Sequence, residues 1–154
     1  MDEDAAIRLR QVITKLARQL NVSSTGEGLT PSQASLLALV VGRGPLSISE
    51  LTELEGLNPT MTSRVLGVLD TMGLIERIPD PSDLRSASIT ATREGRRIDE
   101  RIKAERAAVV SAAIERLPAA QQKAVTAALP ALEALRNELA KTTRAAPSAD
   151  AAST

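Results

Sequence analysis

The chain has 154 residues with 19 basic and 19 acidic side chains, and it contains no Cys, His, Phe, Tyr or Trp. Without cysteine and histidine, disulfides, thiol sensing, the usual zinc sites and histidine-based catalysis are excluded. The length suits about one domain, and its core must consist of aliphatic side chains, which favours helices.

The first predicted element is an amphipathic helix over residues 5–20, followed by a loop over residues 21–28. Three further helices are predicted to begin near residues 31, 48 and 59, where side chains can bond the free amides of a first turn. The start signals are Thr30-Pro31-Ser32-Gln33, Ser47-Ile48-Ser49-Glu50 and Asn58-Pro59.

Glycines mark the predicted ends of these three helices. They are Gly42 and Gly44 with Pro45, then Gly56, and then Gly73. Because only Leu57 separates Gly56 from the cap Asn58, the helices over residues 48–55 and 59–72 are joined by a very tight turn. This spacing predicts a helix-turn-helix.

Two short strands are predicted next, over residues 74–78 and 87–91, with the turn PDPSD between them. Two strands with a connecting loop make a β-wing. Thr92 can cap the following helix, which is predicted to run to about residue 116.

A last helix is predicted over residues 119–141. Pro130 should kink or split it, because proline lacks the amide hydrogen and crowds the previous turn. Residues 142–154 contain few large apolar side chains and are predicted to be a disordered tail.

On a helical wheel, residues 60–72 divide into an apolar side and a small polar side. The apolar side, predicted to face the core, consists of Met61, Val65, Val68, Leu69 and Met72. Thr60, Ser63 and Gly67 lie opposite, with Arg64 and Thr71 at one margin. Small hydroxyl groups, a glycine and an arginine suit the major groove of DNA, where Arg64 could bond a guanine edge or a phosphate. The alternative is an ordinary solvated helix face.

Arg85 lies near the predicted tip of the wing, where it could enter a minor groove. Asp83 would oppose phosphate, unless its carboxylate holds the Arg85 guanidinium in one orientation through a charge-assisted hydrogen bond. The alternative is an ordinary Asp-Arg turn pair, worth about 0 to 1 kcal/mol on a surface.

The run from Leu29 to Gly95 resembles the MarR family of winged helix-turn-helix regulators. The likeness is carried by LTPSQASLLALV, then ISELTELEGLNPTMTSRVLGVLDTMGLIER, then DPSDLRSASITATREGRR. It includes D-x-R at Asp83 to Arg85 and T-x-x-G at Thr92 to Gly95. With the flanking helices, the likeness extends to about Leu139.

The resemblance implies a mainly α fold with a small β-wing, in which a winged helix-turn-helix is flanked by N- and C-terminal dimerisation helices. It implies a homodimer that regulates transcription, as a repressor more often than an activator, by binding a pseudo-palindromic operator in double-stranded DNA. Residues 59–72 would be the recognition helix in the major groove, with the wing in the minor groove. The predicted DNA-binding residues are Asn58, Pro59, Thr60, Thr62, Ser63, Arg64, Gly67, Asp83 and Arg85.

Two positions depart from the family's pattern. Leu84 occupies a place that is often basic in the family, and Pro130 interrupts a helix that the family uses for dimerisation. The family's effectors, often aromatic acids or phenols, usually bind between the DNA-binding and dimerisation parts. A small-molecule effector of this chain would meet only aliphatic walls, arginines and hydroxyl groups there.

The terminal helices also predict a dimer from their own pattern, because a single core of this size leaves little for their apolar sides to cover. A twofold dimer would place two recognition helices about one DNA turn apart, roughly 34 Å. Intramolecular packing of these helices is the alternative. The predicted organisation is a dimerisation helix and loop over residues 1–28, a DNA-binding region over 29–91, dimerisation helices over 92–141 and a tail over 142–154.

Two other classes of function compete with DNA binding. An enzyme would have only Ser, Thr, Lys, Arg, Asp and Glu for chemistry, and no nucleophile motif is present, so we predict no enzyme, metal or cofactor. A winged-helix module that contacts protein without DNA is favoured by the zero net charge and by Asp80 and Asp83, although residues 85–106 are locally basic. No apolar run approaches the ~20 residues of a membrane span, so we expect a cytoplasmic protein.

Overall fold

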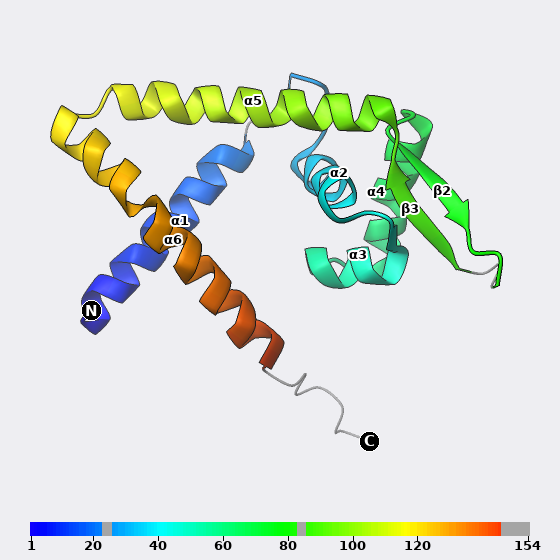
Figure 1. The fold of residues 1–154 in the computed structure, drawn as a ribbon, viewed down its shortest axis with the longest axis horizontal. Coiled ribbons are helices and arrows are strands. Elements are labelled where there is room, and N and C mark those ends of the chain that lie inside the picture. The colour runs from blue at the N-terminus through cyan, green and yellow to red at the C-terminus, as the bar shows by residue number, and fades with distance from the viewer. Residues whose placement is uncertain (23–25, 83–85, 146–154) are drawn as a thin grey trace. The chain divides into compact units, whose positions relative to one another are not determined.

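The fold is mainly helical with a small antiparallel sheet, as the sequence predicts (Figure 1). The computed structural model describes residues 1–22, 26–82 and 86–145. By compactness the chain divides into two units, residues 1–108 and 109–154. In chain order the elements are α1 (Glu3–Val22), α2 (Pro31–Arg43), β1 (Leu46–Ser47), α3 (Ile48–Glu55), α4 (Pro59–Thr71), β2 (Ile75–Pro79), β3 (Ala87–Ala91), α5 (Arg93–Glu115) and α6 (Ala119–Ala145).

The three predicted helix starts are confirmed, and side chains satisfy the free amides at each of them. At the start of α2, Thr30 N–H donates to Gln33 Oε1 (2.9 Å), and Gln33 N–H donates to Thr30 Oγ1 (3.3 Å). Ser47 and Glu50 form the same reciprocal pair at the start of α3, at 2.7 and 3.1 Å. Asn58 caps α4. The capping side chain therefore fixes the residue at which each helix begins.

The sheet has three strands in the order β1-β3-β2, all antiparallel, and the β2–β3 hairpin projects from the helices as a wing (Figure 1). The returning strand β3 is confirmed at its predicted bounds, and β2 is shifted by one residue. The sequence did not predict β1, in which Leu46 pairs with Ile89 and Ser47 with Ser88. Two residues are too few to show an alternating pattern, and their partners lie about forty residues further along the chain.

The core of the first unit is wholly aliphatic. It lies among α2, α3, α4, the sheet and the first turns of α5, which contributes Ile98 and Ile102. Its members are Leu29, Ala34, Leu36, Leu37, Val40, Leu51, Val65, Leu66, Leu69, Leu74, Ile75, Ile89, Ala91, Ile98 and Ile102. These contacts fix α3, α4 and the base of the wing as one body.

Helix α4 ends in the predicted Schellman turn. Gly73 adopts a left-handed conformation (φ 71°), which a residue without a side chain accepts without strain. Leu74 N–H donates to Leu69 O (3.0 Å), and Gly73 N–H donates to Asp70 O (2.9 Å). Leu74 and Leu69 are both buried, so the chain turns back onto the core before β2 begins.

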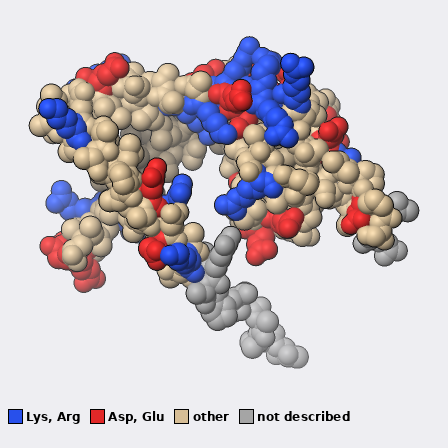
Figure 2. All heavy atoms as spheres, viewed as in Figure 1, with Lys and Arg blue, Asp and Glu red and all other residues tan. Residues whose placement is uncertain are grey.

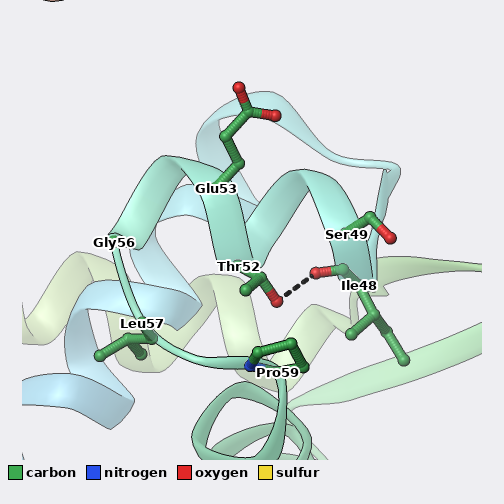
Figure 3. A pocket seen from close by; sticks show the side chains of 7 residues that line it. All are labelled: Ile48, Ser49, Thr52, Glu53, Gly56, Leu57 and Pro59. Atoms are coloured by element: carbon green, nitrogen blue, oxygen red, sulfur yellow. Dashed lines mark hydrogen bonds between the residues drawn. The ribbon is translucent and has the colours of Figure 1, made fainter. Parts of the chain in front are cut away.

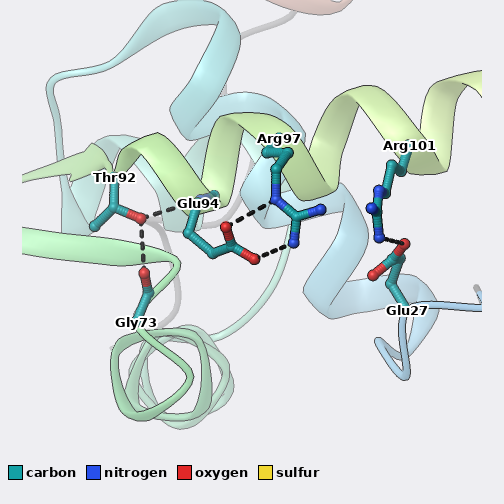
Figure 4. Close-up of polar contacts among 7 residues, drawn as sticks. Glu27, Gly73, Thr92, Glu94, Arg97 and Arg101 are labelled. Carbon is teal, nitrogen blue, oxygen red and sulfur yellow. Dashed lines mark hydrogen bonds and ion pairs between the residues drawn. The ribbon is translucent and has the colours of Figure 1, made fainter.

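The T-x-x-G segment joins the start of α5 to this turn. Thr92 Oγ1 donates to Gly73 O (2.7 Å; Figure 4) and accepts from Gly95 N–H (3.0 Å). Thr92 N–H also donates to Leu74 O (3.1 Å). A Cβ on Gly95 would collide with the backbone carbonyl of Leu74. The motif therefore caps α5 and holds its first turn against the end of α4.

Residues 26–28 are also held against α5. Gly26 N–H donates to Glu105 Oε2 (3.3 Å), and Arg101 Nη1 donates to Glu27 Oε1 (3.2 Å; Figure 4). The Glu27 side chain is mostly covered, whereas that of Arg101 is exposed. The chain that enters α2 is thus tied to the same long helix that follows the wing.

The second unit contains the end of α5 and helix α6. Gln122 Nε2 bonds two carbonyls of the intervening turn, Glu115 O (3.3 Å) and Leu117 O (2.8 Å). Helix α6 runs through Pro130, so the helix is not split there, and it continues to Ala145 rather than ending at Lys141. The rest of the predicted tail, residues 146–154, lies outside the described residues. Within the described part of the chain, no helix is both long and apolar enough to span a bilayer.

We predict that Gly95→Ala lowers the free energy of unfolding by about 1–3 kcal/mol, because the new methyl group overpacks a site closed by backbone. The measurement is chemical denaturation followed by far-UV circular dichroism. Gly42→Ala is the matched control, since a Cβ there meets open space and alanine favours a helix by about 0.5–1 kcal/mol. Equal stability of the Gly95→Ala variant and the unmodified protein would contradict the close packing at Leu74.

Candidate nucleic-acid interface

Helix α4 buries a different stripe from the one its apolar residues predict. The buried residues are Thr62, Val65, Leu66 and Leu69. Met61, Val68 and Met72, predicted to face the core, are 42%, 39% and 43% exposed, so that part of the prediction is wrong. The physical reason is that α4 packs against both α2 and α3. The side of α4 that becomes buried is the one that carries Leu66 and the small Thr62.

The structure also corrects the predicted role of Thr62. Its side chain is 0% exposed, and its hydroxyl donates to the backbone carbonyl of Asn58 (3.1 Å). A buried hydroxyl that is already bonded inside its own helix cannot reach a base. Thr62 therefore packs in the core and is not a candidate contact with DNA.

The outward face of α4 follows from this rotation. Thr60, Arg64, Gly67 and Thr71 recur at intervals of four, three and four residues on the side opposite the buried stripe. Thr60, Arg64 and Thr71 are exposed, and Gly67 is half-buried with open space where a Cβ would lie. Arg64 is thus central to the exposed face rather than at its margin. Ser63 is exposed beside this line.

The start of α4 forms a small hollow on this face. Asn58, Thr60, Met61 and Arg64 line a surface cavity of about 240 Å³. Asn58 Oδ1 accepts from Met61 N–H (2.8 Å), so this oxygen caps the helix, and Pro59 is exposed beside it. The hollow brings together a hydroxyl, an amide, a thioether and a guanidinium, and none of its lining residues is acidic.

A larger hollow lies between α3 and the start of α4 (Figure 3). Its volume is about 450 Å³, and its lining runs from Ile48 and Ser49 on α3 to Pro59. The exposed carboxylate of Glu53 belongs to this lining, and Thr52 Oγ1 is occupied by a hydrogen bond to Ile48 O (2.7 Å). An acid at this position disfavours phosphate, so the α4 hollow is the better candidate for contact with a nucleic acid.

The predicted tight turn between α3 and α4 is confirmed. Gly56 has φ 64°, and its N–H donates to Glu53 O (3.3 Å), so that α3 ends at Glu55 and Gly56 is its C-cap. Leu57 is half-buried against the core. On the wing side of α4, Arg77 of β2 lies 3.7 Å from Asp70, but both side chains are exposed, so this ion pair contributes little to stability.

The two predicted wing contacts, Asp83 and Arg85, lie outside the described residues. The hairpin beside them is closed by Asp80, whose N–H donates to Ser86 O (3.0 Å). Asp80 Oδ1 also accepts from the N–H and the hydroxyl of Ser82 (2.9 and 2.7 Å). Asp80, which the sequence marks only as an acidic wing residue, therefore holds Ser82 and Ser86 at the end of the two strands.

Basic side chains gather over the part of α5 next to the sheet (Figure 2). The Arg97 guanidinium donates to Glu94 and lowers the pKa of that carboxyl, while the same contact raises the pKa of Arg97. Arg93 and Arg96 are exposed and make no ion pair with another residue that the structure describes. The first two turns of α5 thus carry three arginines, Arg93, Arg96 and Arg97, whereas Arg64 is the single cation on α4.

Helix α3, the turn at Gly56, helix α4 and the β2–β3 hairpin together define a winged helix-turn-helix protein. Residues 29–87 match the family model of the MarR family. Over 119 residues the chain is 30% identical to an uncharacterized HTH-type transcriptional regulator of Mycobacterium leprae, an alignment that covers 76% of this chain and 81% of that protein. The chain belongs to the MarR family.

One further relative and one solved structure extend the comparison. The chain is 27% identical over 108 residues to MdtR, an HTH-type transcriptional repressor of Bacillus subtilis, with 70% of each chain covered. The crystal structure of Streptococcus pneumoniae FabT in complex with DNA is similar with a TM-score of 0.63 at 17% identity, covering 87% of this chain and 99% of that one. This second likeness shows that the winged fold extends over most of the chain.

We predict that Asn58→Ala destabilises the protein by about 1 kcal/mol, because the first turn of α4 loses its cap. Asn58→Ser should keep most of that stability, since a serine hydroxyl can accept the same bond. Denaturant unfolding of the two variants against the unmodified protein gives the comparison. Equal stabilities for the alanine and serine variants would remove the capping role.

Proposed function

We propose that this protein is a sequence-specific DNA-binding transcriptional regulator, a repressor that binds a pseudo-palindromic operator as a homodimer. The observation that carries the proposal is the outward face of α4. Thr60, Arg64, Gly67 and Thr71 are directed away from the core on a helix that the core and its caps hold rigidly. The support from known proteins is membership of the MarR family and the fold shared with FabT, whose structure contains DNA.

The chemistry of this face suits the major groove. The groove is about 12 Å wide and admits a helix, and the short side chain of Thr60 and the absence of one at Gly67 let the α4 backbone come close to the bases. Arg64 can donate two parallel hydrogen bonds to O6 and N7 of guanine, a pairing that its fork geometry favours. Ser63, Asn58 and Pro59 complete the contacts that we propose for the start of the helix.

The homodimer is supported by apolar side chains that the chain leaves exposed on its terminal helices. On α1 these are Ile7, Val12, Ile13 and Leu16, and on α6 they are Val125, Leu129, Leu132 and Leu139. Val12, Ile13 and Leu16 share one side of α1, and the four residues of α6 share one side of that helix. Exposed apolar stripes of this kind usually mark an interface, and a second copy of the chain would cover them. We accordingly assign residues 29–91 to DNA binding, and residues 1–28 and 92–141 to dimerisation.

The wing is the second proposed contact with DNA, in the minor groove. Arg85 would supply the cation there and Asp83 would orient it, as the D-x-R pattern predicts; both lie outside the described residues. The repressor role is supported by the likeness to MdtR, which is named a repressor. A protein that covers an operator blocks access to the promoter beneath it.

A protein-contact module without DNA binding is the second candidate. The zero net charge and the acidic hollow beside Glu53 favour it. A salt titration of binding to duplex DNA separates the two functions, because affinity falls steeply with salt when cations neutralise phosphates. A protein adaptor would show no sequence-specific shift at any salt concentration.

We predict that Arg64→Ala weakens operator binding by about 1–3 kcal/mol and relaxes the preference at one base pair in each half-site. Fluorescence anisotropy with an operator and with single-base variants measures both effects. Arg96→Ala is the matched control, since it removes the same charge from the exposed face of α5. A loss that is uniform across all sequences would show that Arg64 contacts phosphate rather than a base.

We predict that Leu129→Glu converts the dimer to a monomer, because a charge placed in an apolar interface loses its water without gaining a partner. Ala134→Glu introduces the same charge on the side of α6 away from the apolar row and should leave the dimer intact. Sedimentation equilibrium of both variants gives the oligomeric state. Unchanged dimerisation of Leu129→Glu would exclude this face of α6 from the interface.

A further inference from the structure

Helix α4 carries an exposed apolar margin that its polar face does not explain. Met61, Val68 and Met72 lie along one side of the outward line, at positions i, i+7 and i+11, and about two-fifths of each is exposed. The opposite margin is polar and is turned toward the wing, because Asp70 pairs with Arg77 of β2. The apolar margin is therefore the one that faces away from β2.

Met61 is the member of this margin that lies in the candidate site. Its side chain lines the same 240 Å³ hollow as Thr60 and Arg64, at the start of α4. Side chains three residues apart on a helix have Cβ atoms about 5–6 Å apart. Successive base pairs are stacked about 3.4 Å apart, so Met61 and Arg64 can contact two neighbouring base pairs.

The chemistry of Met61 selects among the four bases. In the major groove only thymine presents an apolar group, its 5-methyl, while guanine presents two acceptors. A thioether has no strong donor or acceptor for a polar base edge, and its unbranched chain adapts to an apolar contact. An exposed methionine beside an exposed arginine therefore suits a thymine next to a guanine.

We propose that Met61 is a specificity-determining residue that contacts a thymine methyl group while Arg64 bonds the neighbouring guanine. This inference rests on the proposed DNA-binding function and names part of the sequence that the site reads. It concerns a side chain that the sequence pattern assigns to the core. A polar face alone would distinguish guanine, whereas Met61 adds discrimination of thymine from cytosine at the adjacent position.

The test uses the full-length protein and an operator selected from random duplexes. Each thymine of the operator is replaced in turn by deoxyuridine, which keeps the hydrogen-bonding edge and removes only the methyl group. Each half-site should contain one thymine whose replacement, made singly, weakens binding by the unmodified protein about fourfold, as expected for burial of one methyl group. With Met61→Ala the same replacement should have no further effect.

Met72→Ala is the matched control, because it makes the same truncation on the same margin at nearly the same exposure, about three turns away at the C-cap of α4. It should keep the full deoxyuridine penalty at that thymine. An equal penalty for the unmodified protein and Met61→Ala at every thymine overturns the inference, even if operator binding is strong. A second result also overturns the inference. If Met61→Ala is monomeric by sedimentation equilibrium but keeps the base preference of the unmodified protein, Met61 lies in a protein interface.

Failure of the selection has a different meaning. If no duplex is enriched above random sequence, the proposed DNA-binding function fails, and the inference about Met61 fails with it. If a duplex is enriched but no thymine methyl group contributes, only the inference about Met61 fails.

Discussion

The direction in which α4 faces depends on the four side chains that it buries, because a helix that commits one stripe to a core must present the opposite stripe to its surroundings. Leu66 and Leu69 are fully covered in an aliphatic core, and Thr62 fits beside them only because its hydroxyl bonds within the helix. The positions of Thr60 and Arg64 are consequences of this packing. Changes at these buried positions would rotate or loosen the outward face even though none of them touches it.

Hydrogen bonds at both ends of α4 keep the helix in this orientation about its axis. The Asn58 cap fixes the first turn, and the Schellman turn at Gly73 fixes the last. Thr92 then bonds the carbonyl of Gly73, so that α5 starts from the end of α4 rather than from a free loop. A side chain at Gly95 would force these two helices apart at this junction. The outward face is therefore positioned by backbone contacts as well as by the core.

Local hydrogen-bond chemistry explains why much of this fold could be predicted from the sequence. A cap such as Thr30 with Gln33, or an ending such as Gly73, depends on a few consecutive residues, and the structure confirms both. The MarR family, which those signals together with the wing pattern indicate, is confirmed by the comparisons.

The rotation of α4 could not be predicted in the same way, because it depends on where α2 and α3 lie, and hydrophobicity favours the long Met61 over the small Thr62. Of the predicted contacts on α4, Thr62 is therefore buried, while Asn58, Pro59, Thr60, Ser63 and Arg64 are exposed and Gly67 is half-buried. Strand β1 was missed because its partner β3 is distant in the chain.

The aliphatic core has a spectroscopic consequence. A protein without Trp, Tyr or Phe has no side chain that absorbs near 280 nm, so the whole molecule is silent in near-ultraviolet absorption and in intrinsic fluorescence. One tryptophan introduced at a chosen surface position would be the sole emitter in the chain. Fluorescence from that single indole would report only on the surroundings of the substituted position.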